Sequence, residues 1–147
     1  MKKQLTTTCA ALLATTALSL GAAPAEARGT NCYGVQASAT TTSNGTAFVG
    51  DAVFRLNGDE VTVGAVAVVT SATSTTHEFQ TPWGTLTTED QLILVPVDPA
   101  NGIFSLRSRL TVVDGGSGKL QLLPSSRIDL LNGTATWQAR GHVCIDG

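Results

Sequence analysis

Two short segments of the chain hold side chains that could transfer protons. His77 is followed by Glu78, and Glu89 is followed by Asp90. An imidazole changes its charge near neutral pH, and a carboxylate within about 3 Å of it can orient the ring or share its proton. These residues are therefore candidates for general acid and base chemistry if the fold brings them together. The sequence leaves the individual roles of His77 and Glu89 open.

Glu89 and Asp90 cannot both face the interior of a β-structure, because adjacent residues of a strand point to opposite faces. If Leu86, Leu92 and Leu94 mark the inner face of this segment, Asp90 shares that face and Glu89 is exposed. An inward Asp90 would either anchor the polar group of a ligand or fill a structural role, paired with an arginine or a neighbouring threonine. Asp90 is therefore the candidate polar residue of an interior site.

The sequence offers no metal site and no activated nucleophile. Its two histidines, His77 and His142, are too few for a zinc site without carboxylates at ligand spacing. Ser105, Ser108 and Ser117 do not belong to a Gly-x-Ser-x-Gly motif, which marks the nucleophile of many hydrolases. We predict no metal and no cofactor, and we assign no catalytic residue.

The aromatic side chains form the second set of candidates. Trp137 has small neighbours such as Ala135 and Ala139, which leave room for its ring inside a barrel, as core or as a ligand contact. Trp83 lies in a Pro-Trp-Gly turn, where an exposed ring would be a lid over a pocket or a contact with a partner protein. The predicted ligand-binding residues are apolar or aromatic except for one carboxylate: Phe54, Trp83, Asp90, Phe104, Leu106 and Trp137.

The elements that must position these residues are strands. Residues 84–118 read as one long β-hairpin, with alternating runs at 85–97 and 103–113 on either side of an Asp-Pro-Ala-Asn-Gly turn. Other alternating or β-branched segments are separated by Asn-Gly, Pro and Gly-rich breaks: residues 32–42, 46–56, 60–71, 71–80, 119–123, 126–131 and 134–145. No segment has a sustained helical period, so we predict a single all-β domain of eight or nine strands.

Two cysteines indicate how these strands are arranged. Cys32 and Cys144 lie in the first and last predicted strands, and in an oxidising compartment we expect them to form a disulfide. A meander of strands has two unpaired edges, and closure into a barrel removes both. We therefore predict an antiparallel up-and-down β-barrel of about eight strands. An immunoglobulin-like sandwich is the alternative, although its bridge would join interior strands.

Residues 1–27 have the features of a secretory signal peptide. Lys2 and Lys3 precede an uncharged stretch rich in Ala and Leu, and Ala25-Glu26-Ala27 places small residues three and one positions before a cut after Ala27. Residues 28–147 would then form the secreted barrel domain, extracellular or periplasmic and not held in a membrane. The small negative charge of this part argues against nucleic acid as a partner and leaves a protein partner open.

Four segments are similar to parts of a known family: residues 76–79, 84–90, 110–118 and 139–144. Through them the chain resembles small bacterial secreted proteins with the allene oxide cyclase barrel, the eight-stranded barrel that plant dirigent proteins also have. The resemblance implies an interior pocket, and family members of known activity cyclise or couple reactive apolar substrates by holding their conformation. Lys119 stands where an aromatic residue commonly follows the family's glycine-rich turn, so no catalytic residue is transferred by this resemblance.

Three functional hypotheses follow. The first is a barrel that binds a small, mostly apolar molecule in its interior. The second is an enzyme of the cyclase or isomerase type, which needs a buried titratable residue beside the pocket. The third is a proteinase inhibitor or adhesion module that acts through its rim loops and needs no cavity. A packed interior would argue against the first two, and an apolar cavity without a titratable group would argue against the second.

Overall fold

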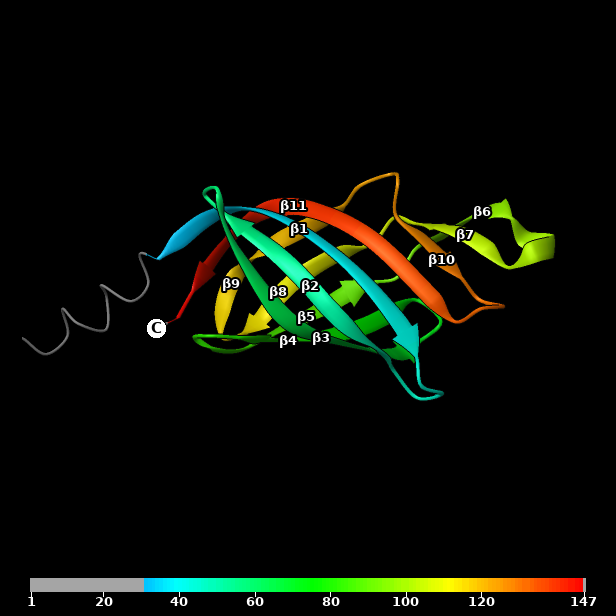
Figure 1. The fold of residues 1–147 in the computed structure, drawn as a ribbon, viewed down its shortest axis with the longest axis horizontal. Helices are drawn as coiled ribbons and strands as arrows, with labels where there is room; N and C mark the ends of the chain where they lie inside the picture. Colours follow the sequence, from blue (N-terminus) through cyan, green and yellow to red (C-terminus); the bar gives the residue numbers. More distant parts are fainter. Residues whose placement is uncertain (1–30, 147) are drawn as a thin grey trace, which may run out of the picture.

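The computed structural model describes residues 31–146, so the predicted signal peptide at residues 1–27 lies outside the described residues. The described part consists of antiparallel strands and one short 3₁₀ turn, η1 (Pro99–Asn101), as Figure 1 shows. The strands are β1 (Cys32–Ser43), β2 (Phe48–Leu56), β3 (Asp59–Ser71), β4 (Ser74–Thr81), β5 (Gly84–Gln91), β6 (Leu94–Asp98), β7 (Ile103–Leu106), β8 (Arg109–Asp114), β9 (Gly116–Leu122), β10 (Arg127–Asp129) and β11 (Thr134–Ile145). The all-β prediction is confirmed.

Eight of these strands close into a barrel, as the sequence predicts. Their order is β1-β2-β3-β4-β5-β8-β9-β11, and β11 pairs again with β1. The closing pair is antiparallel, and its register runs from Cys32 opposite Cys144 to Thr42 opposite Thr134. Closure leaves no unpaired edge within the ring of eight strands. The sandwich alternative is therefore wrong.

The long hairpin at residues 84–118 forms, but it is not continuous. Its two strands are interrupted at residues 92–93 and 107–108, so that β5 pairs with β8 inside the barrel and β6 pairs with β7 beyond it. The sheet formed by β6 and β7 is extended by β10, which pairs with both β7 and the first residues of β11. These three strands project past the end of the barrel that lies away from the C-terminus (Figure 1). The expectation of two unbroken strands is wrong. Eight other strands close the barrel, so the outer half of the hairpin, β6 and β7, lies outside the ring and pairs with β10.

The barrel interior is packed with alternating side chains over part of its length. Inward positions of β1, β2 and β11 hold small residues such as Ala37, Ala52 and Ala139, all buried. Large rings fill the space that these alanines leave. Phe54 and Phe79 meet edge to face with centroids 5.1 Å apart, and Phe79 meets Trp137 at 6.2 Å. This arrangement of aromatic pairs is favourable beyond the apolar area that it buries.

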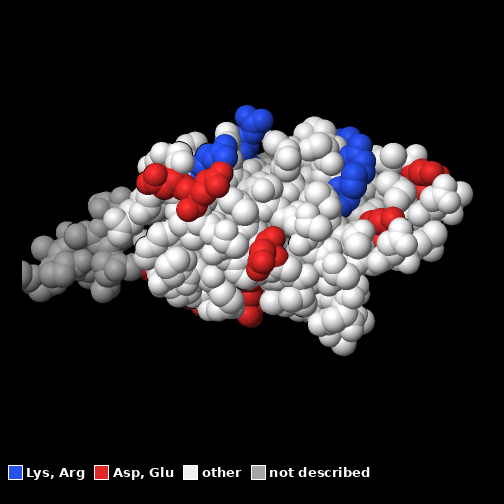
Figure 2. Space-filling view, in the orientation of Figure 1, with Lys and Arg blue, Asp and Glu red and all other residues white. Residues whose placement is uncertain are grey.

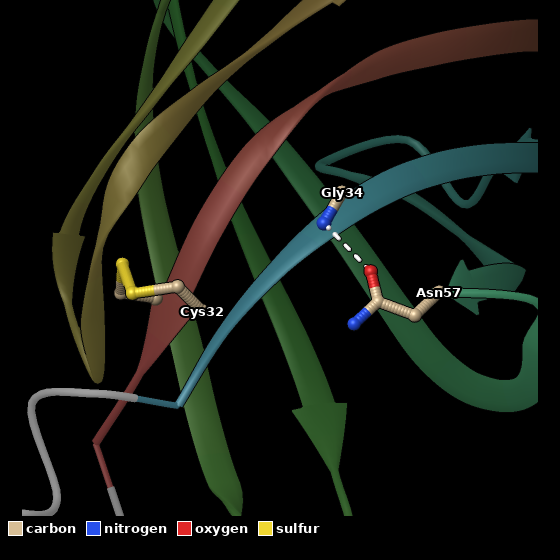
Figure 3. Close-up of a disulfide and its surroundings, with 4 residues drawn as sticks. Cys32, Gly34 and Asn57 are labelled. Carbon is tan, nitrogen blue, oxygen red and sulfur yellow. Dashed lines mark hydrogen bonds between the residues drawn. A yellow bond between two sulfur atoms is a disulfide. The ribbon is translucent and has the colours of Figure 1, made fainter.

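The predicted disulfide between Cys32 and Cys144 is present. It joins the beginning of β1 to the end of β11, at the place where the barrel closes (Figure 3). Near it the side-chain Oδ1 of Asn57 accepts a hydrogen bond of 3.1 Å from the backbone N–H of Gly34, as Figure 3 shows. The turn between β2 and β3 is thereby tied to β1. The disulfide between Cys32 and Cys144 fits an oxidising compartment.

Charged side chains are sparse on the outer surface. On the face in Figure 2, Lys and Arg occur in small separate groups, with Asp and Glu close to some of them. Arg55 and Glu60, both exposed, form an ion pair across β2 and β3. A pair of this kind contributes little to stability. Residues 31–146 contain no helix with the length and apolar character of a membrane-spanning segment.

Removal of the disulfide should lower stability without opening the barrel. The two cysteines are 112 residues apart, and the chain-entropy relation gives on the order of 4 to 5 kcal/mol for a loop of that size. The β1 and β11 ladder persists over eleven residue pairs without the bond. We expect the double variant Cys32→Ser, Cys144→Ser to keep its far-ultraviolet circular dichroism while its urea midpoint falls. An unchanged midpoint would contradict this account of the closing strands.

Candidate ligand-binding cavity

A cavity of about 290 Å³ lies at the end of the barrel from which β6, β7 and β10 project. Its wall is mainly apolar and comes from strands on all sides of the ring. Deep positions include Ala67, Leu110, Leu122, Ala135 and Trp137, and positions nearer the mouth include Val69, Leu94 and Leu130. The interior is therefore packed at one end and hollow at the other.

His77 is the one titratable side chain on this wall among the described residues. It lies on β4, is 9% exposed, and its ring is fixed by aromatic neighbours. The ring stacks on Phe79 with centroids 5.4 Å apart and meets the edge of Trp137 at 5.7 Å. The imidazole therefore has a defined orientation at the boundary between the packed half and the cavity.

Asp90 contacts Nδ1 of His77 and fixes the orientation of the ring. Its Oδ2 lies 2.5 Å from Nδ1 of His77 and accepts a bond of 2.7 Å from the hydroxyl of Thr75, while its Oδ1 accepts one of 2.6 Å from the hydroxyl of Thr88. Asp90 is 4% exposed. A carboxylate buried in this way requires partners for its charge. Three donors supply them.

The register of β4 and β5 explains this cluster. Thr75 lies opposite Asp90, and His77 lies opposite Thr88, so that four inward positions form a square across two strands. All four side chains face the interior because each pair is two residues apart on its strand. As the alternation of the strand predicts, Asp90 is buried and Glu89 is exposed.

The partnership between His77 and Asp90 was not deduced from the sequence, although a signal for it exists. In a hairpin centred on Pro82-Trp83, residues 77 and 88 are opposite, and so are residues 75 and 90. The polar residues at these four positions would have indicated a buried cluster. Finding it required the exact register of the turn, which the sequence analysis did not assign.

The other predicted ligand-binding residues lie in several places. Leu106 and Trp137 line the cavity. Phe54 is buried in the packed half, where its ring meets Phe79. Phe104 is partly buried on β7 and packs against the core, outside the cavity wall. Trp83 is 45% exposed in the turn between β4 and β5, at the opposite end of the barrel. Ligand contact by any of these residues stays a prediction.

The remaining candidates for chemistry are dispersed. Glu78 is exposed on the outer face of β4, and His142 is exposed on the outer face of β11. Within residues 31–146, no group of three or more His, Cys, Asp or Glu side chains lies close enough together to hold a metal ion. The chemistry that the cavity itself can supply is therefore hydrogen bonding and proton transfer at one oriented imidazole.

Comparison with known proteins adds no relative: no protein-family model, no curated protein and no solved structure matches the chain. The resemblance to allene oxide cyclase barrels therefore stays a prediction, and the functional argument depends on the cavity.

A second carboxylate shapes the mouth of the cavity. Asp129, at the end of β10, accepts hydrogen bonds from the backbone N–H of Leu131 at 3.1 Å and of Asn132 at 3.0 Å, and from the side-chain amide of Asn132 at 2.6 Å. The bonds from Asn132 lower the pKa of Asp129 below its usual value. The turn that they hold contains Leu130, which reaches the cavity wall.

The stability of this turn should depend on pH in acid. The ionised carboxylate is the hydrogen-bonded form, so the folded chain gains stability above the pKa of an unfolded aspartate and loses it as the pH falls through the lowered pKa. An NMR titration of the Asp129 carboxyl carbon should give a midpoint below 3.8, and Asn132→Ala should raise that midpoint. A midpoint that Asn132→Ala leaves unchanged would contradict the assignment.

The cluster around Asp90 should be far more sensitive to mutation than its neighbour on the strand. Asp90→Ala leaves the hydroxyls of Thr75 and Thr88 and Nδ1 of His77 without their buried acceptor. We expect it to destabilise the protein by about 3 to 5 kcal/mol. The control Glu89→Ala removes an exposed carboxylate from the same strand and should change stability by less than about 0.5 kcal/mol. Urea denaturation measures both, and similar losses for the two variants would overturn this reading.

Proposed function

We propose that the protein binds one small, mostly apolar molecule in the cavity at the open end of the barrel, in an extracellular or periplasmic setting. The observation that carries this proposal is the cavity itself, about 290 Å³ of mainly apolar wall in a barrel whose other half is packed. Sites for small molecules are typically concave and apolar with a few placed polar groups.

The volume indicates the size of the ligand. A dry apolar cavity of about 150 Å³ in another protein holds one benzene molecule. A cavity of about 290 Å³ therefore suits a molecule with on the order of a dozen non-hydrogen atoms, such as a bicyclic ring system or a short branched chain. Its mainly apolar lining favours a compound with few polar atoms.

The three strands outside the ring support the proposal. They do not contribute to barrel closure, because eight other strands form the closed ring. Residues on or beside them, including Leu94, Leu106, Ile128 and Leu130, contribute instead to the cavity wall. The outer hairpin and β10 thus extend the barrel at its open end and deepen the cavity.

The predicted signal peptide and the disulfide support the compartment. A protein that carries a poorly soluble compound outside the cytoplasm needs an apolar interior that its own side chains do not fill. The alanines and threonines at the open end, Thr41, Ala67 and Ala135 among them, leave that space.

A second candidate function is an enzyme of the cyclase or isomerase type. It is favoured by the pair of His77 and Asp90, because a carboxylate that orients an imidazole is a common arrangement for general acid and base catalysis. Such an enzyme would release a product of altered structure, whereas a binding protein would return its ligand unchanged.

A native mass spectrum of the protein purified from its secretion compartment tests the proposal when it is compared with the denatured mass. We expect an added mass that is lost on denaturation. Ala135→Phe, which places a ring in the cavity, should abolish that added mass because Ala135 is buried on the cavity wall.

Trp83→Ala is the matched control: the sequence predicts Trp83 as a ligand contact, but it lies at the opposite end of the barrel and does not line the cavity. It should retain the added mass. Loss of the added mass in Trp83→Ala but not in Ala135→Phe would place the site at the other rim. A bare chain in every sample would favour the hypothesis of rim loops that recognise another protein.

A further inference from the structure

We propose that the molecule bound in the cavity carries one uncharged N–H or O–H group, and that this group donates a hydrogen bond to Nε2 of His77. The inference rests on the proposed function and adds the chemical class of the ligand. It depends on which nitrogen of the imidazole carries the proton and on which polar atoms of the cavity already have partners.

Asp90 determines the tautomer of His77. With Asp90 ionised, its carboxylate only accepts hydrogen bonds, so Nδ1 of His77, 2.5 Å from Oδ2, carries the proton. In the uncharged imidazole the other nitrogen, Nε2, is then an acceptor with a free lone pair. Asp90 cannot turn away to release the ring, because the hydroxyls of Thr75 and Thr88 hold its two oxygens.

Nε2 is the polar atom that His77 offers to the cavity. The ring lines the cavity, Asp90 does not, and Nδ1 is directed toward Asp90. No hydrogen-bond partner for Nε2 exists among residues 31–146, although the residue is only 9% exposed. A buried acceptor without a partner is costly, so a ligand that donates a hydrogen bond to Nε2 should bind more tightly than one of the same shape that cannot.

The hydroxyl groups on the cavity wall are already engaged with the protein. Thr75 donates to Asp90, and Thr41 donates to the backbone oxygen of Ala135 at 3.5 Å. Ser108 accepts a hydrogen bond of 3.5 Å from a backbone N–H, and Ser71 at the mouth shares its hydroxyl with the neighbouring Ser74. Each of these hydroxyl groups has a hydrogen-bond partner in the protein, whereas Nε2 of His77 has none among residues 31–146.

Charge selects a neutral group over an anion. An ionised Asp90 already places one buried negative charge next to His77. A ligand carboxylate would bring a second negative charge close to it and would meet a lone pair at Nε2. An amine would need its own counter-ion on an apolar wall. A neutral N–H or O–H group satisfies Nε2 and adds no charge.

The test uses two bicyclic probes of nearly the same shape and size. Indole has one N–H donor, and benzothiophene has none. Their affinities for residues 28–147 are measured by equilibrium dialysis, for wild type and for His77→Phe. This variant keeps a ring at position 77 but has no hydrogen-bond acceptor there. The ratio of the two affinities in wild type, divided by the same ratio in the variant, cancels the difference in hydrophobicity between the probes.

We expect that quotient to be about ten for His77→Phe, the value of one good hydrogen bond in an apolar site. His142→Phe is the matched control, because His142 is exposed on the outside of the barrel, and the quotient formed with it should be near one. A second readout needs no variant: the ¹⁵N resonance of His77 Nε2 in wild type should shift when indole binds and not when benzothiophene binds.

The outcomes separate this inference from the proposed function. If both probes bind and the quotient for His77→Phe is near one, or the Nε2 resonance responds equally to both, the cavity binds apolar molecules without the predicted hydrogen bond and the inference is wrong. If benzothiophene-2-carboxylate binds more tightly than indole, the group recognised is an anion and the inference is again wrong. If none of the three probes binds, the proposed function itself fails.

Discussion

The pairing of β1 with β11 is the constraint on which the structure depends. It converts a meander with two edges into a closed ring, and only a closed ring has an interior. The disulfide fixes this pairing at one end, and the ladder of residues from Cys32 to Thr42 continues it to the other. An eight-stranded ring is just wide enough for its side chains to fill it or for one small ligand. Which of the two occurs is decided by side-chain size at each level.

Filled and unfilled levels occur in the same barrel. At the end near the disulfide, rings such as Phe54 and Phe79 occupy the space between small residues. Toward the other end the inward positions of β1, β3 and β11 become Thr41, Ala67 and Ala135, and the ring nearest the mouth, Phe48, is only partly buried. Trp137 stands at the boundary and touches both halves. The cavity is thus the part of the interior beyond the packed rings of Phe54 and Phe79.

The closed ring of strands could be predicted from the sequence. The extension of three strands, β6, β7 and β10, beyond it could not. Alternation and turn residues predict most strands, and the positions of Cys32 and Cys144 predict closure. The break at residues 92–93 was not predictable, because Leu94 continues the alternating pattern although it lies at the mouth and is exposed. Alternation shows that a strand has two faces and does not show which sheet it joins. Asp90 could be placed inside by parity alone, whereas its bond to His77 depends on register.

The polar cluster raises the question of why a barrel keeps a buried carboxylate at all. A buried ion pair or hydrogen-bonded charge is weak evidence for stability, since well-packed apolar residues of similar volume often stabilise a protein as well or better. Apolar side chains at positions 75, 77, 88 and 90 would fill the same space without any desolvation cost. The cluster instead gives each oxygen of Asp90 a hydrogen-bond donor and leaves Nε2 of His77 without a partner among residues 31–146, on a side chain that lines the cavity. The cost of burying a carboxylate explains the three donors around Asp90. It does not explain why Nε2 of His77 lacks a partner among residues 31–146. Under the proposed function, a ligand that donates to Nε2 supplies the partner that the described part of the chain does not.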